Sequence, residues 1–210
     1  NPTGTMVSAA EVARLHAGLR PDILLVLDSA YAEYLDRPDY DDGLELSRTA
    51  SNVLTTRTFS KIHALAAFRV GWCHGPAAVI AAMDKVRGPF NTTSAGIAAA
   101  VAALADDAAV ERARAHNRQW RDWLFDQCAR LSNHGVRAIP SVANFVMLVF
   151  PADGPVTAGG AFRALADAGF MTRWLTPQGM DDCLRISVGT AEETQGVAAA
   201  LEAYVHSAAG

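Results

Sequence analysis

The sequence predicts an α/β fold, with strands and helices alternating in the first part and a smaller α+β part after it. The first observation is Ile23–Leu27, an unbroken apolar run of the kind found in parallel strands buried on both faces. The second is a change to shorter elements in the C-terminal part of the chain. We therefore expect a mostly parallel sheet flanked by helices at residues 1–105 and a small α+β domain at residues 106–210.

Length and composition agree with this organisation and exclude several function classes. The 210 residues are half hydrophobic, which is enough for a sizeable core, and the net charge is −4. The basic residues are scattered, which argues against nucleic acid as a partner, and no apolar run approaches the ~20 residues of a membrane span. Cys73, Cys128 and Cys183 match no metal or disulfide spacing. We expect reduced thiols, no metal and a cytoplasmic protein.

The first part begins with a turn-forming cluster, Asn1-Pro2-Thr3-Gly4-Thr5, and has no initial Met. Because turns connect elements, we expect this chain to be the C-terminal part of a longer protein. Ser8 and Glu11 have capping-box spacing, which predicts a helix start. The elements expected after this start are a helix at Ala9–Gly18, strands at Ile23–Leu27, Asn52–Thr56 and Phe68–Cys73, and a helix at Ala77–Val86.

The second part is predicted to be helical from Ser94 to about Leu131, with a break near Asp106. The charges after the break indicate a long helix with one exposed face. Thr190 and Glu193 form a second capping-box pattern. The remaining expected elements are strands at Val136–Ile139, Asn144–Phe150, Phe170–Trp174 and Cys183–Val188, and helices at Thr157–Ala168 and from Thr190 to about His206.

Lys61 is the residue most suggestive of chemistry. It follows the predicted strand Asn52–Thr56 within Arg57-Thr58-Phe59-Ser60-Lys61, and Arg69 comes eight residues later. A reactive amine next to hydroxyls and a cation suits a site that holds a phosphate beside a Schiff base. We therefore expect Lys61 to bind pyridoxal phosphate covalently.

Other residues supply what this cofactor requires from a protein. Asp28 ends the apolar strand, where ligands of open α/β sheets bind, and would keep the pyridine nitrogen protonated. Tyr31 and Asn1 would donate to the phenolic oxygen. Thr58, Ser60 and Arg69 would hold the phosphate, provided that the chain turns near Ser60, because an extended chain would point Lys61 away from the two hydroxyls.

Each of these residues also has an ordinary structural explanation. Asp28 suits the cap of a turn, Thr58 and Ser60 suit turn formation, and Arg69 suits a structural pair. A lysine after a strand is usually a solvated surface residue. Five residues in this order favour a cofactor site more strongly than any one of them does alone: Asp28, Thr58, Ser60, Lys61 and Arg69.

The chain resembles a known family at several motifs. Those shared with fold-type-I aminotransferases are Asn1-Pro2-Thr3-Gly4, Asp28-Ser29-Ala30-Tyr31, Thr58-Phe59-Ser60-Lys61 and Phe68-Arg69-Val70-Gly71-Trp72. Those similar to the histidinol-phosphate aminotransferase family are Arg57-Thr58-Phe59-Ser60-Lys61, Asn144-Phe145 and Leu184-Arg185-Ile186-Ser187-Val188-Gly189-Thr190. The chain departs from the family pattern at Ser29, where Glu is usual, and at Ala64–Phe68.

The resemblance implies roles for particular residues. Lys61 would carry the cofactor and serve as the base of the proton shift. Arg185 would bind the substrate carboxylate, and the phosphate of the alternative substrate, with Arg173 assisting. An edge-of-strand salt bridge is the other explanation for Arg185. The family is dimeric with a shared active site, so a homodimer is implied.

The implied function is transamination between L-histidinol phosphate and 2-oxoglutarate in histidine biosynthesis. An aromatic amino acid aminotransferase, a threonine-phosphate decarboxylase and an effector-sensing module of a transcription regulator are alternatives with related folds. The family's N-terminal half supplies a phosphate loop, an aromatic residue stacked on the cofactor and a tyrosine across the dimer, none of which is in these residues. We therefore expect little or no activity from this chain alone.

Overall fold

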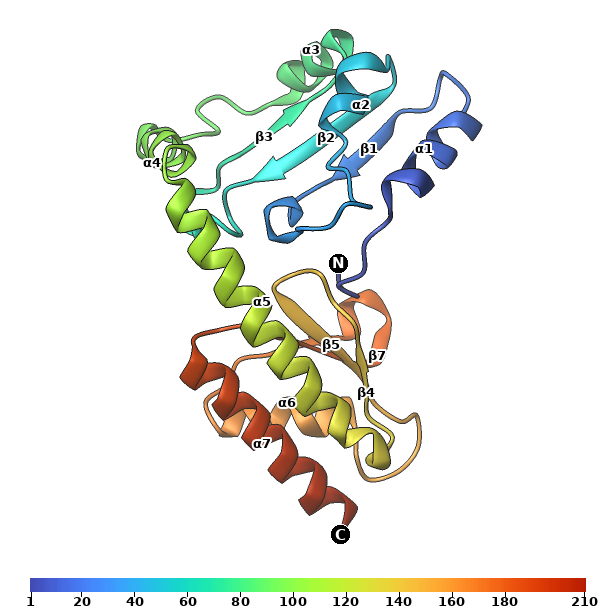
Figure 1. Ribbon diagram of the computed structural model, residues 1–210, viewed down its shortest axis with the longest axis vertical. Coiled ribbons are helices and arrows are strands. Elements are labelled where there is room, and N and C mark those ends of the chain that lie inside the picture. Colours follow the sequence, from blue (N-terminus) through green and yellow to red (C-terminus); the bar gives the residue numbers. More distant parts are fainter. The chain divides into compact units, whose positions relative to one another are not determined.

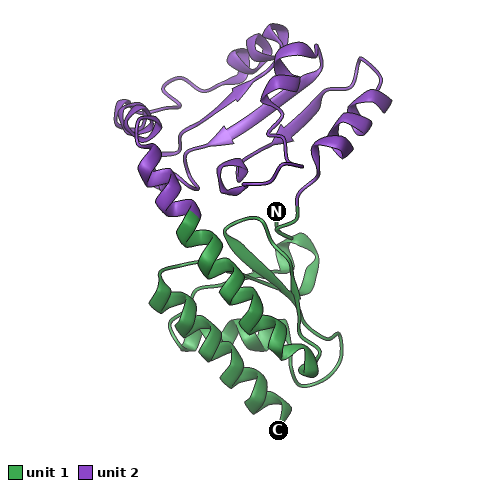
Figure 2. Cartoon of the chain, in the orientation of Figure 1, with its two compact units in different colours: residues 1–5, 115–210 green, residues 6–114 purple.

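A computed structural model describes all residues from 1 to 210 (Figure 1). The chain forms two compact units, one of Met6–Arg114 and one of Asn1–Thr5 with Ala115–Gly210 (Figure 2). Helix α5 (Asp107–Ala129) is continuous across this division. The contact boundary thus lies within a helix and not in a linker, and the domain ranges 1–105 and 106–210 stay a prediction.

The Met6–Arg114 unit is built on a three-stranded sheet in the order β1-β2-β3. Strand β1 (Leu25–Asp28) pairs in parallel with β2 (Val53–Thr58), and β3 (Gly71–His74) pairs antiparallel with β2. Helix α2 (Leu44–Thr49) packs against β2 and β3. The other helical elements of this unit are α1 (Ala9–Gly18), η1 (Ala32–Tyr34), η2 (Ala66–Phe68), α3 (Ala77–Val86), α4 (Ser94–Leu104) and the first turns of α5 (Figure 1).

The α/β prediction is confirmed. The three strands of this chain form a mixed sheet, in which β1 and β2 are parallel and β3 runs against β2. Strand β1, however, is not buried on both faces: it is an edge strand whose side chains alternate in exposure, and Val26 is 50% exposed. An apolar run reports the character of its side chains, whereas burial also depends on what covers each face.

The third strand begins later than the sequence predicted. The expected strand at Phe68–Cys73 is β3 at Gly71–His74, preceded by the 3₁₀ turn η2. Arg69 has φ +53° and ψ +45°, a left-handed conformation that a strand does not contain. The backbone therefore changes direction at Arg69 before β3 starts.

Both predicted capping boxes are present. In α1 the Ser8 hydroxyl accepts from the Glu11 amide, and the Glu11 carboxylate accepts from the Ser8 amide at 2.8 Å. Thr190 and Glu193 make the same reciprocal pair at the start of α7 (Ala191–Ala209). Each box satisfies amides that the first turn of a helix leaves unpaired.

The other unit contains a fully antiparallel sheet in the order β4-β5-β7-β6. Its strands are β4 (Arg137–Ile139), β5 (Phe145–Val149), β6 (Arg173–Leu175) and β7 (Met180–Ser187). Helices α6 (Ala158–Asp167), α7 and the later part of α5 cover one face.

The core of this unit lies between that sheet face and the helices. Val146, Leu148, Leu184 and Ile186 point into it from β5 and β7. Met147 and Cys183, one position away on the same strands, belong to a second cluster on the opposite face. Residues in phase with Met147 and Cys183, including Arg185, therefore lie on the face away from the helices. No helix of the chain is long and apolar enough to span a membrane.

Candidate functional site

The chain turns directly after β2, which is the condition that the Lys61 site requires. β2 ends at Thr58, and the following residues form a turn in which the Ser60 amide donates to the Thr58 hydroxyl at 3.0 Å. Phe59 is buried at this turn and its amide donates to the Val70 carbonyl at 3.1 Å. The turn reverses the alternation of an extended strand, so Ser60 and Lys61 are no longer forced to opposite sides.

Arg69 and Ser60 are brought together by this turn. The Arg69 Nη1 donates to the Ser60 Oγ at 3.3 Å and to the Ala66 carbonyl at 2.8 Å. The left-handed backbone of Arg69 lets its side chain return toward the loop that carries Ser60. A guanidinium and a hydroxyl at one exposed position are donors suited to a phosphate.

Lys61 lies next to Tyr31. The Lys61 Nζ is 5.3 Å from the centroid of the Tyr31 ring, within the range of a cation–π contact. Tyr31 precedes η1, on the connection that leaves β1. Sequence spacing placed these two residues at the ends of neighbouring strands, and the structure puts their side chains in contact.

Asp28 ends β1 opposite Thr56 in the parallel ladder. Its Oδ1 accepts from the Ala30 amide at 3.2 Å, so it does cap the turn, as its ordinary structural explanation held. The carboxylate is otherwise exposed at the carboxyl edge of the sheet. That edge is where ligands of open α/β sheets bind, and the remaining acceptor capacity is available to a donor there.

The predicted substrate residues belong to the other unit. The Arg185 Nη1 donates to the Asn1 Oδ1 at 2.6 Å, although 184 positions separate the two residues. The Arg185 guanidinium carbon also lies 4.6 Å from the centroid of Phe145. Arg173 is directly opposite Arg185 in the β6–β7 ladder. The structure thus groups Asn1, Arg173 and Arg185 within one unit.

A partly buried ion network beside the Lys61 turn was not predicted from the sequence. Arg57, immediately before Thr58, donates through Nε and Nη2 to the Glu33 Oε1 at 3.1 and 2.8 Å, and through Nη1 to the Asp42 Oδ2. The Arg57 and Glu33 side chains are only 14% and 15% exposed. Both acidic partners lie on the connection between β1 and β2, so no local spacing in the sequence indicated them.

The network shows how these charges are kept buried. Burial opposes the charge of Arg57, but the hydrogen bonds and charges of Glu33 and Asp42 outweigh it, and the pKa of Arg57 is raised. Burial, with Tyr31 and Glu33 nearby, raises the pKa of Tyr34 to about 12. Tyr34 is therefore neutral at physiological pH.

No group of three or more His, Cys, Asp or Glu side chains is arranged to hold a metal ion. The potential ligands described above are an amine, carboxylates, hydroxyls and guanidinium groups. The amine, the hydroxyls and the guanidinium groups are hydrogen-bond donors suited to an organic anion.

Comparison with known proteins agrees with this chemistry. Residues 1–201 match the model of the family described as "Aminotransferase class I and II". The chain is 53% identical over 203 residues to the histidinol-phosphate aminotransferase of Sphingopyxis alaskensis, covering 97% of this chain and 54% of that protein.

Two solved structures extend the comparison. The histidinol-phosphate aminotransferase of Sinorhizobium meliloti in complex with pyridoxal-5'-phosphate has a TM-score of 0.86 at 30% identity, over 99% of this chain and 55% of that one. The L-threonine-O-3-phosphate decarboxylase of Porphyromonas gingivalis has a TM-score of 0.83 at 20% identity, over 98% and 62%, and shows the fold alone.

The chain spans about half the length of the curated relatives it matches. Its resemblance to fold-type-I aminotransferases, inferred from short motifs, is confirmed by a match over nearly the whole chain. The chain therefore belongs to the class I and II aminotransferase family.

Proposed function

We propose that the protein containing this chain transfers an amino group between L-histidinol phosphate and 2-oxoglutarate, as an enzyme of histidine biosynthesis that uses pyridoxal 5'-phosphate. The observation that supports this most directly is the loop after β2, which brings Lys61 to Tyr31 and Ser60 to Arg69. The similarity to histidinol-phosphate aminotransferases from several bacteria supports the choice of substrate.

The donor set fits the cofactor. Lys61 offers a primary amine for covalent attachment, and Ser60 and Arg69 offer hydroxyl and guanidinium donors for a phosphate. Thr58 also fits, because its oxygen accepts from the Ser60 amide while its own hydroxyl proton is left to donate. Pyridoxal phosphate, when bound, supplies an electron-withdrawing ring that stabilises negative charge on the substrate α-carbon.

The remaining residues would orient groups and move protons. Asp28 would accept from the ring nitrogen and hold a proton there, and the Tyr31 hydroxyl and the Asn1 amide would donate to the phenolic oxygen. The Lys61 Nζ would take the substrate proton and return it, because it is the flexible amine beside the reacting atoms.

Arg185 and Arg173 would bind the anionic end of the substrate. They are directly opposite one another in the β6–β7 ladder, where two like charges are unfavourable unless an anion or another acceptor compensates them. Asn1 accepts from one arm of Arg185 and would fix its orientation. A pair of guanidinium groups suits a phosphate or a carboxylate, which a bidentate fork recognises.

We further propose a homodimer with a shared active site and a cytoplasmic location. The dimer is supported by family membership and by the exposed apolar side chains of α4: Ile97, Val101 and Leu104. The cytoplasmic location is supported by the three free cysteines.

The test uses the full-length protein. Borohydride reduction in the presence of pyridoxal phosphate should fix the label on the peptide containing Lys61, and Lys61→Ala should abolish it. Lys85 is the other lysine of these 210 residues, so Lys85→Ala is the matched control and should keep the label. A label that persists in Lys61→Ala contradicts the assignment.

Substrate choice is tested by the spectrum of the bound cofactor. Glutamate and L-histidinol phosphate should each convert it, and 2-oxoglutarate should restore it. Conversion by phenylalanine in preference to L-histidinol phosphate would favour an aromatic aminotransferase, and release of carbon dioxide from threonine phosphate would favour a decarboxylase. Either result would contradict the proposed substrate.

A further inference from the structure

The Glu33–Arg57 ion pair joins the two segments that carry Tyr31 and Lys61. Glu33 is two residues after Tyr31 in the turn η1, and Arg57 is four residues before Lys61 on β2. Arg57 makes two hydrogen bonds to one oxygen of Glu33, and both side chains are largely buried. We propose that this pair is a positioning device that holds the Tyr31 turn against the Lys61 loop and thereby sets the contact between Tyr31 and the reactive amine.

On the Tyr31 side, Glu33 is held through both its side chain and its backbone. Its carboxylate accepts from Arg57, and its backbone carbonyl accepts from the Arg114 Nε of α5 at 2.7 Å. The turn itself is closed by the Tyr34 amide, which donates to the Tyr31 carbonyl at 3.0 Å. A displacement of Glu33 would therefore move the backbone of Tyr31.

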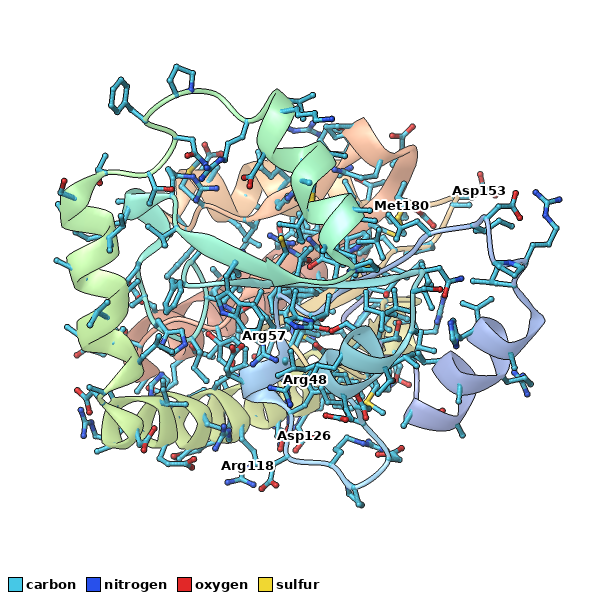
Figure 3. The ribbon with its side chains drawn as sticks, turned by 90° about the horizontal axis from the view of Figure 1, so that it is seen from above. Arg48, Arg57, Arg118, Asp126, Asp153 and Met180 are labelled. Carbon is cyan, nitrogen blue, oxygen red and sulfur yellow. The ribbon has the colours of Figure 1, made fainter.

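The Lys61 side is fixed by Arg57 and by what surrounds it. Arg57 is opposite Trp72 on β3, and its guanidinium carbon lies 5.6 Å from the centroid of that ring. The remaining guanidinium nitrogen, Nη1, donates to the Asp42 Oδ2. Arg57 is labelled in Figure 3. Because Thr58 follows directly and the turn to Lys61 comes next, the position of Arg57 determines where the loop begins.

Asp42 ties the same network to the residue after β1 and to the middle of β2. Its carbonyl accepts from the Ser29 hydroxyl after β1 and from the Thr55 hydroxyl on β2, each at 2.8 Å. Ser29 is the residue at which this chain departs from the usual Glu of the family, and it is buried. The Ser29 hydroxyl, in place of the usual Glu side chain, thus anchors the connection between β1 and β2 that carries Glu33 and Asp42.

Positioning explains why charges are used here. Burying an ion pair costs desolvation, and apolar residues of similar volume often give equal or greater stability. A guanidinium fork, however, fixes the angle and distance between two segments, which apolar packing does not. Glu33 and Arg57 do not touch the cofactor in this proposal; they act through Tyr31 and the Lys61 loop.

This inference rests on the proposed function in taking Lys61 as the cofactor amine, so the decisive measurement is made on the apoprotein. An acylating reagent modifies Lys61 and Lys85 in the full-length protein, and mass spectrometry gives the ratio of the two rates. The Tyr31 ring lies against the Lys61 amine, so Glu33→Gln should free the amine and increase its acylation rate relative to Lys85, by about 2- to 30-fold if the contact is lost. Glu45→Gln breaks the exposed pair with Arg48 and is the matched control, with an unchanged ratio.

The route through Tyr31 is tested by a double-mutant cycle. Tyr31→Leu should raise the ratio by itself, and adding Glu33→Gln should change it little further, because the two substitutions remove the same contact. Additive effects would overturn the proposal. So would a Glu33→Gln variant whose circular dichroism and labelling ratio both match those of the wild type, since the pair would then have no effect on Lys61.

Two further observations complete the test. If Glu33→Gln does not fold, Arg57→Lys keeps the charge but loses the fork, and a folded Arg57→Lys with a wild-type ratio would overturn the proposal. In the holoprotein, Glu33→Gln should weaken pyridoxal phosphate binding and shift its absorbance band, whereas Glu45→Gln should do neither. The variants can show the expected labelling ratios while the wild-type protein binds no cofactor at Lys61. That combination would contradict the proposed function and leave the positioning role supported.

Discussion

The Arg69 Nη1 donates to the Ser60 Oγ at 3.3 Å from a backbone in the left-handed region. A bulky residue in that region is strained, and strain of this kind persists only where surrounding structure determines it. The contact unites a turn after β2 with the segment before β3. It provides the two donors of the proposed phosphate site.

Arg69→Gln should weaken binding of pyridoxal phosphate by about 10- to 100-fold, the range expected for a lost hydrogen bond to a charged group. Binding of pyridoxal, which has no phosphate, should change little. The measurement is the dissociation constant of each compound in the full-length protein. Arg20→Gln removes an exposed arginine paired with Asp22 and is the control. Equal weakening for both compounds would contradict the phosphate assignment.

Arg185→Lys should raise the KM for glutamate by about 10- to 100-fold, because lysine keeps the charge but loses the bidentate fork. The spectrum of the bound cofactor should not change. Steady-state kinetics of the full-length protein measures both quantities. Arg137→Lys, on an exposed position of β4, should leave KM unchanged. If Arg185→Lys behaves like Arg137→Lys, Arg185 has only a structural role.

Cys128 should make stability depend on alkaline pH. Burial raises the pKa of its thiol to about 12 from a usual value of 9, so the folded state favours the protonated thiol. This contribution to the free energy of unfolding is complete below pH 9 and is lost as the pH rises from 9 toward 12. The free energy of unfolding, measured with urea between pH 8 and 11, should fall less steeply with pH in Cys128→Ala than in the wild type. Parallel curves would refute the effect.

Leu124→Ala should lower the free energy of unfolding by about 2–5 kcal/mol, because Leu124 is 0% exposed and the substitution leaves a cavity in the core of the unit formed by Asn1–Thr5 and Ala115–Gly210. Met171 is 84% exposed, and Met171→Ala should be close to neutral. Urea unfolding measures both values. Similar losses for the two variants would show that the cluster around Leu124 is not the main core.

Local signals predicted much of the fold. The capping boxes at Ser8 and Thr190 located the starts of α1 and α7, since the hydrogen bonds that they predict join residues three apart. The helix at Ala77–Val86 was predicted with its observed bounds. The boundaries of strands were less well predicted, because the start of β3 depends on the conformation of Arg69 and not on the apolar pattern.

Long-range interactions were the part that the sequence did not predict. The spacing of Asp28, Tyr31 and Lys61 indicated one edge of a sheet, because parallel strands end at the same edge. The network around Arg57 was not predicted, since a carboxylate on a long connection has no fixed distance from a strand until the chain folds. The exposure of β1 was missed for a related reason: it depends on the layers that surround the strand.

The hydrogen bond between Asn1 and Arg185 spans nearly the whole chain. During synthesis, Asn1 leaves the ribosome long before β7 exists, whereas the residues of the Lys61 loop are close together in sequence. Because distant contacts carry a larger entropy of loop closure, the bond between Arg185 and Asn1 is expected to form later than the contacts of the Lys61 loop. A growing chain can thus form that loop while β7 is still missing, and only the completed β7 ties the first residue to the rest of its unit.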